Sequence, residues 1–512
     1  MHITNIPLEV FLDNLLPFTP VRDVLSLGST NKFFAAVSAD ETFWKRKCEA
    51  DFNFTSQETA RKSGWKNLYR GLSHPRIFVW GERRNGRLGL KNFPKDVQNG
   101  ASYPIEVKIP GSRIVSLVAG GMSFHALDSK GSMYVWGTLN GESLALNSEG
   151  FSVKYKAAPT PHKLIMPNPV RTISCGRMHT MVLDSMSHVW TFVNWGRPFR
   201  LDTPMLDCHS PETTPLQAES GWAFCAILTQ SNDVLVFWPF SGEVGRQYEE
   251  ENAAMDERGD CHAYPTSEHS IPCVAWELRA DPLRVPPIPR GKSKETVLIK
   301  IAAFDNHLIG LTNKGHVLKF GDLSNENSFN MSTRWEYLEN FSELTKVSAH
   351  PITHITAHFE TFVAYSSSVI LMGDVRTNSD SQPKIIPKLQ NRSVISIVLG
   401  DYHYGALTVD GQLLTWGQYS HGALGLGIPT ELPLGAPGGY SAEAQLIQAR
   451  SSQWGPLEPP SVVSPSPVHF NHGQNPGGKR FCFAATAAGW HTGALIICLE
   501  VSCPSKSVVQ YF

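Results

Sequence analysis

The sequence predicts a mainly β fold, a seven-bladed β-propeller that is preceded by a small α-helical domain. Three observations predict it. The stretch from Val394 to Gly427 has the order strand, strand, turn and strand. Weaker copies of this order recur through most of the chain, whereas residues 1–50 have the apolar spacing of helices. A repeat array also accounts for a length of 512 residues, because each unit buries its hydrophobic face against its neighbours.

The composition is that of a soluble globular protein, with 41% hydrophobic and 18% charged residues. A formal net charge of -1 gives no general attraction to nucleic acid or to an anionic membrane. No apolar run approaches the length of a membrane span, and the N-terminus lacks the basic segment of a secretory signal. The nine cysteines include no Cys-x-x-Cys pair, so we interpret them as reduced thiols of a cytoplasmic or nuclear protein.

Helical signals come first along the chain. Pro7 suits the first turn of a helix, and Pro17 ends that helix. Between them, apolar side chains at helical spacing predict one continuous stripe: Leu8, Phe11, Leu12, Leu15 and Leu16. Further short helices are predicted after a cap and first-turn proline at Thr19-Pro20, around Phe33, and after Asp40, which caps the last of them.

The residues from Ile6 to Cys48 resemble the F-box in spacing and in residue type. The matching pairs are Ile6-Pro7, Leu15-Leu16, Val24-Leu25, Phe33-Phe34 and Phe43-Trp44. Ile6 replaces a commoner leucine, and the segment Gly28 to Asn31 is less bulky than in many members. The resemblance implies a helical hook that inserts apolar residues into the adaptor of a cullin-type SCF ubiquitin ligase. The adaptor-binding residues that it implies are Pro7, Leu8, Leu12, Leu15, Leu16, Val24, Leu25 and Trp44. The alternative is a helical cap that only packs on the repeats.

The repeat units number seven. Equivalent apolar positions in the second strand of each unit are Leu127, Leu183, Leu228, Leu311, Tyr365, Leu407 and Leu495. The first third-strand ending, Ile77 to Gly81, has no half-unit before it, and the last unit, Phe481 to Leu499, has none after it. These two halves complete each other, so we predict a ring closed by Ile77 to Leu90 against Phe481 to Leu499. Asp410-Gly411 predicts a two-residue hairpin turn.

Three recurring phrases, Val-x-Trp-Gly, Asn/Tyr-x-x-Gly-x-Leu-Gly and Gly-x-x-His-x-x-Ala-Leu, resemble the repeats of the regulator of chromosome condensation. Clear copies lie at Val79 to Gly89, at Val135 to Gly137 and from Gly400 to Gly427. One repeat position is occupied by histidine in four units: His179, His307, His403 and His491. A propeller spreads equivalent positions around its axis, so these histidines are predicted to form structural hydrogen bonds instead of a metal site. The Trp-Gly pairs are predicted to combine inter-blade packing with a positive-φ turn.

The predicted boundaries are an F-box at 1–50, a helical linker at 51–76 and the propeller at 77–512. Insertions are expected at about 239–297, which is acidic and then proline-rich, and at about 428–480, which contains Trp454. Each insertion suits either a binding loop or an unstructured surface loop. Cys261, His262 and Cys273 suggest a metal only weakly, because a second ligand pair is missing.

The sequence contains no phosphate-binding loop, no His-Glu-x-x-His helix and no Gly-x-Ser-x-Gly elbow. We therefore expect a protein without catalytic residues, cofactor or metal. An F-box followed by this propeller resembles the fungal SCF-associated factor family. That resemblance implies a substrate receptor, whose partners are the SCF adaptor, through it the cullin and RING subunits, and an unidentified substrate protein that is ubiquitinated for proteasomal degradation.

Two other classes of function stay open. One is a guanine-nucleotide exchange factor or a chromatin-associated scaffold of the chromosome-condensation-regulator type; the helical N-terminus and the near-zero net charge disfavour nucleosome binding. The other is a propeller enzyme with a metal in its channel. Neither nucleic acid nor a membrane is expected as a partner, and the sequence assigns no substrate-binding residue.

Overall fold

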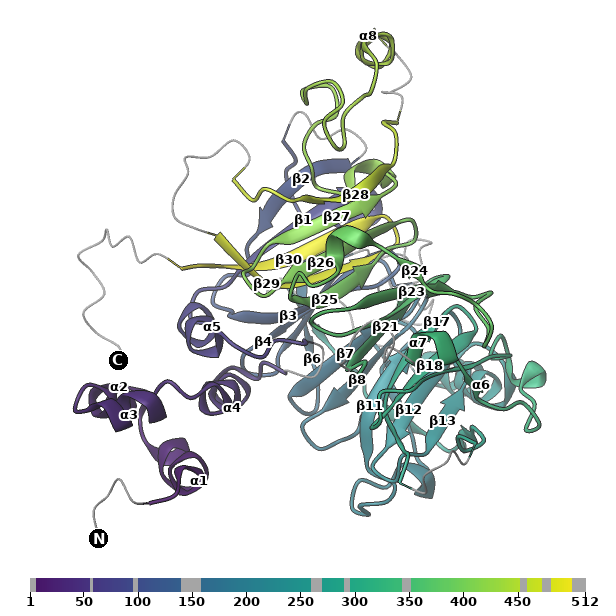
Figure 1. The fold of residues 1–512 in the computed structure, drawn as a ribbon. Coiled ribbons are helices and arrows are strands. Elements are labelled where there is room, and N and C mark those ends of the chain that lie inside the picture. Colours follow the sequence, from purple (N-terminus) through teal and green to yellow (C-terminus); the bar gives the residue numbers. More distant parts are fainter. Residues whose placement is uncertain are drawn as a thin grey trace.

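The computed structural model describes residues 6–55, 59–94, 100–139, 158–258, 269–289, 295–342, 351–451, 458–471 and 480–499. These residues form seven sheets arranged as the blades of a propeller, with a helical head against one end of the ring (Figure 1). The predicted fold class, a mainly β seven-bladed propeller preceded by helices, is therefore confirmed. None of the described helices is both long enough and apolar enough to cross a membrane.

The head has helices where the sequence predicts them: α1 (Leu8–Val10), a π-helical turn η2 (Phe11–Leu15), a 3-10 turn η3 (Leu16–Phe18), α2 (Val21–Gly28), α3 (Lys32–Val37), α4 (Glu41–Phe52) and α5 (Trp65–Gly71). The Asp40 carboxylate caps α4 by accepting the Phe43 N–H at 2.9 Å, as expected. Pro20, by contrast, is the cap of α2 and not its first helical residue.

Blade 1 closes the ring with strands from both ends of the chain. Its order is β2 (Gly100–Val107), β1 (Arg76–Glu82), β30 (His491–Cys498) and β29 (Arg480–Ala488). β1 pairs antiparallel with β30, so that Ile77 lies opposite Leu495 and Gly81 opposite His491. Figure 1 shows these early and late strands side by side. The predicted closure is confirmed, and it pairs two strand edges that would otherwise be exposed.

Blades 2 to 4 contain the strands from β3 to β16. Blade 2 consists of β3 (Ile114–Ala119), β4 (Ser123–Asp128), β5 (Met133–Gly137), β6 (Ala158–Ile165) and β14 (Ser270–Pro272). Blade 3 consists of β7 (Val170–Cys175), β8 (Thr180–Asp184), β9 (Val189–Phe192), β10 (Phe199–Leu201) and β15 (Trp276–Leu278). Blade 4 consists of β11 (Pro215–Ser220), β12 (Cys225–Thr229), β13 (Val234–Phe237) and β16 (Leu283–Arg284).

Blades 5 to 7 have four strands each. Blade 5 consists of β17 (Leu298–Phe304), β18 (His307–Thr312), β19 (Val317–Phe320) and β20 (Glu336–Tyr337). Blade 6 consists of β21 (His354–His358), β22 (Thr361–Tyr365), β23 (Ile370–Asp374) and β24 (Lys384–Ile385). Blade 7 consists of β25 (Val394–Leu399), β26 (His403–Thr408), β27 (Leu413–Gly417) and β28 (Val462–Pro467).

Both expected insertions contribute to the blades. In the first, helix α6 (Gly242–Arg258) is followed by β14, β15 and β16. β14 and β15 add parallel outer strands to blades 2 and 3, and β16 completes blade 4. The second supplies β28 of blade 7 and helix α8 (Glu443–Ser451), which stands clear of the blades in Figure 1. A short helix α7 (Glu339–Ser342) follows blade 5. Trp454 lies outside the described residues.

One predicted turn differs from the structure. The Gly411 N–H donates to the Thr408 carbonyl at 3.0 Å, and Gly411 has φ +80°. The connection is therefore a four-residue turn from Thr408 to Gly411, and the predicted two-residue turn at Asp410-Gly411 is wrong. Because glycine has no Cβ, Gly411 can take the left-handed conformation that returns the chain to β27.

Contacts between neighbouring blades confirm the predicted structural role for two of the four repeated histidines and for one Trp-Gly pair. The Trp80 indole N–H donates to the Ala423 carbonyl of blade 7 at 2.8 Å, and the following Gly81 has φ +102°. His403 Nε2 lies 2.8 Å from the Thr492 hydroxyl of blade 1. His491 Nε2 in turn lies 3.2 Å from the Ser123 carbonyl of blade 2. These two histidines therefore join adjacent blades.

The first strand of each blade lies innermost, except in blade 1, where β29 takes this place. Together these seven strands surround a channel of about 470 Å³ on the axis of the ring. Its lining mixes apolar residues with polar ones such as Thr172, Gln217 and Thr486. The ring is thus a rigid scaffold with two ends, and the head is docked at one of them.

Candidate functional site

The head exposes a group of large apolar side chains on its first four helical segments, from α1 to α2. Leu8, Val10, Leu15 and Leu25 are 41–46% exposed, and Phe18 is 83% exposed. We call these five residues the head patch. Exposed apolar side chains that gather on one small domain are typical of a protein–protein contact.

A π-helical turn creates this patch. The Leu16 N–H donates to the Phe11 carbonyl five residues earlier, which widens the helix between them. Phe11 and Leu16 are consequently both buried, while Leu8 and Leu15 are turned to the surface. The sequence predicted one continuous stripe from Leu8 to Leu16, and the structure divides it into an inner and an outer set.

The inner set forms the core of the head. The Phe11 ring contacts those of Phe33 and Phe34 edge-to-face, at centroid distances of 5.7 and 5.9 Å. Val24 is buried in the same core. Trp44 is also buried, and its indole N–H donates to the Ser38 carbonyl at 2.8 Å.

The structure therefore separates the predicted adaptor-binding residues by exposure. Pro7, Leu8, Leu15 and Leu25 are exposed, and Leu12 is partly buried. Leu16, Val24 and Trp44 are buried, so in this conformation they support the surface from beneath. Val10 and Phe18 are exposed apolar residues that the sequence did not single out. Phe18 follows Pro17, the residue at which the sequence predicts the first helix to end, so the helical period gives no signal for Phe18.

Charged and polar contacts fix the head helices to one another. Asp13 of η2 pairs with Arg46 of α4. The Glu41 carboxylate accepts the N–H groups of Gly64 and Trp65, both at 2.9 Å, which fixes the start of α5 to α4. The Tyr69 hydroxyl donates to Asp51 at 2.6 Å; burial and this carboxylate raise the Tyr69 pKa. These contacts hold the helices that carry the exposed apolar side chains in fixed positions.

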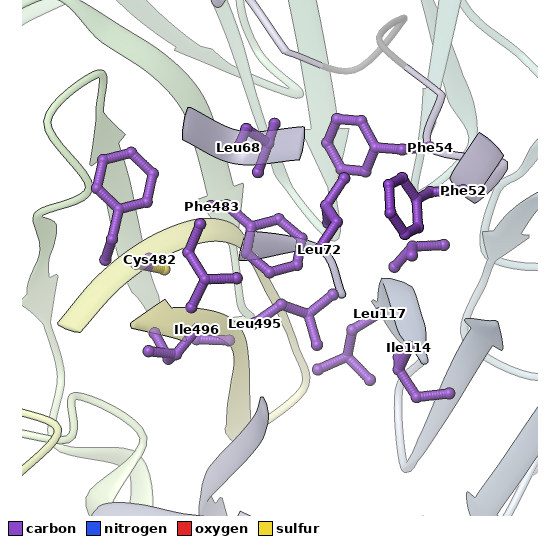
Figure 2. Close-up of a cluster of buried hydrophobic side chains, with 14 of the residues drawn as sticks. Phe52, Phe54, Leu68, Leu72, Ile114, Leu117, Cys482, Phe483, Leu495 and Ile496 are labelled. Atoms are coloured by element: carbon purple, nitrogen blue, oxygen red, sulfur yellow. The ribbon is translucent and has the colours of Figure 1, made fainter. Parts of the chain in front are cut away.

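A buried apolar cluster seats the head on the ring (Figure 2). Phe52, Phe54, Leu68 and Leu72 come from the head side, and Phe483, Leu495 and Ile496 come from blade 1. Phe54 and Phe483 meet edge-to-face at 5.9 Å. Burial raises the pKa of the Cys48 thiol to about 12, so Cys48 remains a neutral core residue. The head and propeller thus share one continuous core.

The segment between α4 and α5 also donates hydrogen bonds to main-chain carbonyls of the ring. Asn53 Nδ2 donates to the Val170 carbonyl of blade 3 at 3.0 Å, and the Ala60 N–H donates to the Ile395 carbonyl of blade 7 at 2.7 Å. The buried Arg61 guanidinium donates to the Val409 carbonyl at 3.3 Å. Burial lowers the Arg61 pKa to about 10, which still leaves it charged near neutral pH.

The suggested metal ligands do not gain support. Cys261 and His262 lie outside the described residues, and the Cys273 thiol donates to the Trp195 carbonyl at 3.3 Å. Among the described residues, Asp207, Cys208 and His209 place ligand atoms within 4.8 Å of one another, but they are successive residues of a surface loop. The seven cysteines in the described ranges are all free thiols. The absence of a metal and a cofactor stays a prediction.

Known proteins resemble the chain in both of its parts. The family model of the regulator of chromosome condensation repeat matches residues 130–183. The chain is 22% identical over 519 residues to "F-box protein pof9" of Schizosaccharomyces pombe, covering 96% of this chain and 90% of that protein. It is 24% identical over 332 residues to "SCF-associated factor 1" of Saccharomyces cerevisiae, covering 64% of this chain and 42% of that protein. These matches support an F-box protein with chromosome-condensation-regulator repeats.

Two further matches are more limited. The chain is 35% identical over 118 residues to the human "Probable E3 ubiquitin-protein ligase HERC3", of which it spans only 10%. The crystal structure of human WBSCR16 superposes with a TM-score of 0.52 at 16% identity, covering 83% of this chain and 100% of that one. This likeness supports the propeller fold and nothing further.

Proposed function

We propose that this chain, an F-box-type protein with a propeller, is the substrate-recognition subunit of an SCF-type cullin-RING ubiquitin ligase. The head binds the adaptor and through it the cullin and RING subunits, and the propeller binds a client protein. The chain itself carries out no covalent step. It acts by proximity, because holding client lysines near a ubiquitin-charged enzyme raises their effective concentration.

The observation that carries this proposal is the head patch. Its side chains are exposed on helices whose own core is complete, so their exposure does not follow from poor packing. The resemblance to an F-box protein extends over 96% of the chain, across head and ring alike. The shared core beneath the head also supports the proposal, since a receptor must hold its client at a fixed distance from the ligase.

The test is co-purification of the tagged full chain with the SCF adaptor. In the variant Leu8→Asp, Leu15→Asp, two charges enter the head patch without touching the buried core, so we expect adaptor recovery to fall at least tenfold. The matched control is Leu434→Asp, Val463→Asp, at exposed apolar positions outside the head. The control should recover adaptor as the parent does. A folded parent that recovers no adaptor contradicts the proposal.

The second function, guanine-nucleotide exchange, is favoured only by the repeat match at residues 130–183. It is tested by release of a fluorescent guanine nucleotide from a panel of purified small GTPases. Under our proposal the purified chain leaves the intrinsic release rate unchanged. Acceleration of one GTPase by tenfold or more, from a chain that binds no adaptor, would establish the alternative instead.

A further inference from the structure

The end of the channel opposite the head is the open end of the ring. The head-side contacts at Val170 and Ile395 lie where inner strands begin. The inner strands finish at the other end, where the residues after them form a small pocket at the channel mouth. Its lining includes Arg177, Trp222 and Phe359. We call this end the distal mouth.

Aromatic rings form a continuous row along the distal mouth. The Trp222 and Phe359 rings lie 5.8 Å apart, and the Phe359 and Tyr402 rings lie 5.7 Å apart. Tyr402 is 42% exposed. Phe359 has φ +53°, a left-handed conformation that is unfavourable for so large a side chain. Strained residues of this kind gather at binding sites, where the surroundings hold them in place.

Arg177 of the chain itself shows that a cation can lie against this row of rings. Its guanidinium lies 5.2 Å from the centre of the Trp222 ring and 3.6 Å from an Asp401 carboxylate oxygen. Asp401 is also 3.2 Å from His358 Nε2. An aromatic face beside a carboxylate is a favourable place for a cation, because the ring quadrupole and the negative charge both attract it.

Two further acidic residues, Asp305 and Glu360, belong to the distal mouth or adjoin it. Asp305 lines the distal mouth together with Trp222 and Phe359, and its main-chain carbonyl accepts the main-chain N–H of Trp222 at 3.0 Å. Glu360 directly follows Phe359 and is exposed. Burial and the neighbouring Glu360 raise the Asp305 pKa. Within the part of the chain that the structure describes, neither carboxylate forms an ion pair. The distal mouth thus combines aromatic rings with a carboxylate that has no cationic partner among the described residues.

We propose that the distal mouth binds an arginine or lysine side chain of the client protein, held between the rings of Trp222 and Phe359 and the carboxylates of Asp305 and Glu360. The inference rests on the proposed function in one respect, that the client is a protein bound by the propeller. It adds the chemistry of recognition, a basic segment of the client, and the end of the ring that receives this segment. Charge complementarity favours such a segment over an acidic or phosphorylated one.

The test uses two pools of nonapeptides with either arginine or citrulline at the centre and no lysine or arginine elsewhere. Citrulline keeps the shape of arginine but has no charge. Immobilised full-length protein should retain the arginine pool at least fivefold more than the citrulline pool. Asp305→Asn, Glu360→Gln should abolish this preference, and asparagine tolerates the φ of +28° at Asp305. The matched control, Glu431→Gln, Glu443→Gln, changes two exposed carboxylates of the second insertion and should keep the preference.

Equal retention of both pools by the parent overturns the inference, as does a preference that survives in Asp305→Asn, Glu360→Gln. Adaptor co-purification is measured on the same variants and reports on the head alone. Failure of the peptide test with normal adaptor recovery rejects the distal mouth but leaves the receptor role intact. If the parent chain does not recover the adaptor, the receptor role is rejected, whatever the result of the peptide test.

Discussion

Two adjacent leucines of the head have opposite surroundings. Leu15 is 46% exposed, whereas Leu16 is fully buried, because the π turn places Leu16 beside Phe11. The sequence could identify both as apolar residues of one helix. It could not tell them apart, because an ordinary helical period puts both on the same stripe and a single wide turn has no periodic signal.

We expect alanine at these two positions to have distinct effects. Leu16→Ala removes packed methyl groups from the core and should lower the free energy of unfolding by about 2–5 kcal/mol. Leu15→Ala should change stability by no more than about 0.5 kcal/mol, yet weaken adaptor recovery. Urea unfolding and co-purification distinguish the two outcomes. A stable Leu16→Ala variant would contradict the placement of Leu16 in the core.

The buried histidines between blades predict an acid sensitivity. Burial lowers the pKa of His179 and of His403 to about 4. In the unfolded chain these groups titrate near 6.5, so the unfolded state binds more protons below that pH. The two neutral histidines therefore make their full contribution to the free energy of unfolding above pH 6.5. This contribution falls as the pH approaches 4, by about 2 kcal/mol per histidine at pH 5.

The measurement is urea unfolding at pH 7 and pH 5. His403→Gln should be less stable at pH 7, because the bond to Thr492 is altered, and should lose less stability between the two pH values than the parent. His209→Gln, at an exposed position, is the matched control and should behave as the parent does. An unchanged pH dependence in His403→Gln would show that His403 is not a source of the acid sensitivity.

At the scale of single elements, the strands that carry the repeated apolar pattern could be predicted from the sequence, and those without it could not. The second and third strands of every blade carry the recurrent apolar pattern, and all seven second-strand reference positions, such as Leu407, are buried. The strands β14, β15 and β16 have only two or three residues each and pair with partners distant in sequence. So short a segment has no period of its own. The first insertion was therefore not recognised as part of the blades.

Helix α5 depends on a close approach to blade 1. A Cβ added to Gly71 would lie 2.8 Å from the Ile497 Cβ and would collide with its side chain. We expect Gly71→Ala to push the head from its seat and to speed proteolytic cleavage between α4 and α5. Asn67→Ala, at an exposed position of the same helix, is the control and should resist cleavage as the parent does. Equal cleavage of both variants would contradict this expectation, because it would show that α5 accepts the added methyl group and stays docked on blade 1.

At the scale of the whole molecule, the ring and the head depend on the same two strands. β30 completes the ring by pairing with β1, and Phe483, Leu495 and Ile496 of β29 and β30 also form the seat of the head. The sequence predicted the ring closure from two half-units. It did not predict the docking of the head there, because docking surfaces carry no repeat pattern.

Removal of residues 480–512 should therefore affect both parts. Such a chain exposes the edge of β1 and the apolar side chains of Phe54 and Leu68, so we expect it to aggregate. A chain that ends at Leu499 keeps β30 complete and is the control. Size-exclusion chromatography compares the two. A monomeric product of the shorter chain would show that the ring does not need its closing strands.

Because the head docks on the last strands of the chain, it can dock only after the whole chain has been synthesised. The head is synthesised first, and the residues of blade 1 that bind it are synthesised last. The apolar side chains of Phe52 and Leu68 therefore stay exposed until Phe483 and Leu495 have left the ribosome. Until then the exposed apolar surface makes the nascent chain prone to aggregation. A message that is cut short yields a head with no place to dock and a ring that cannot close. Completion of translation is thus what joins the head and the ring into one folded unit.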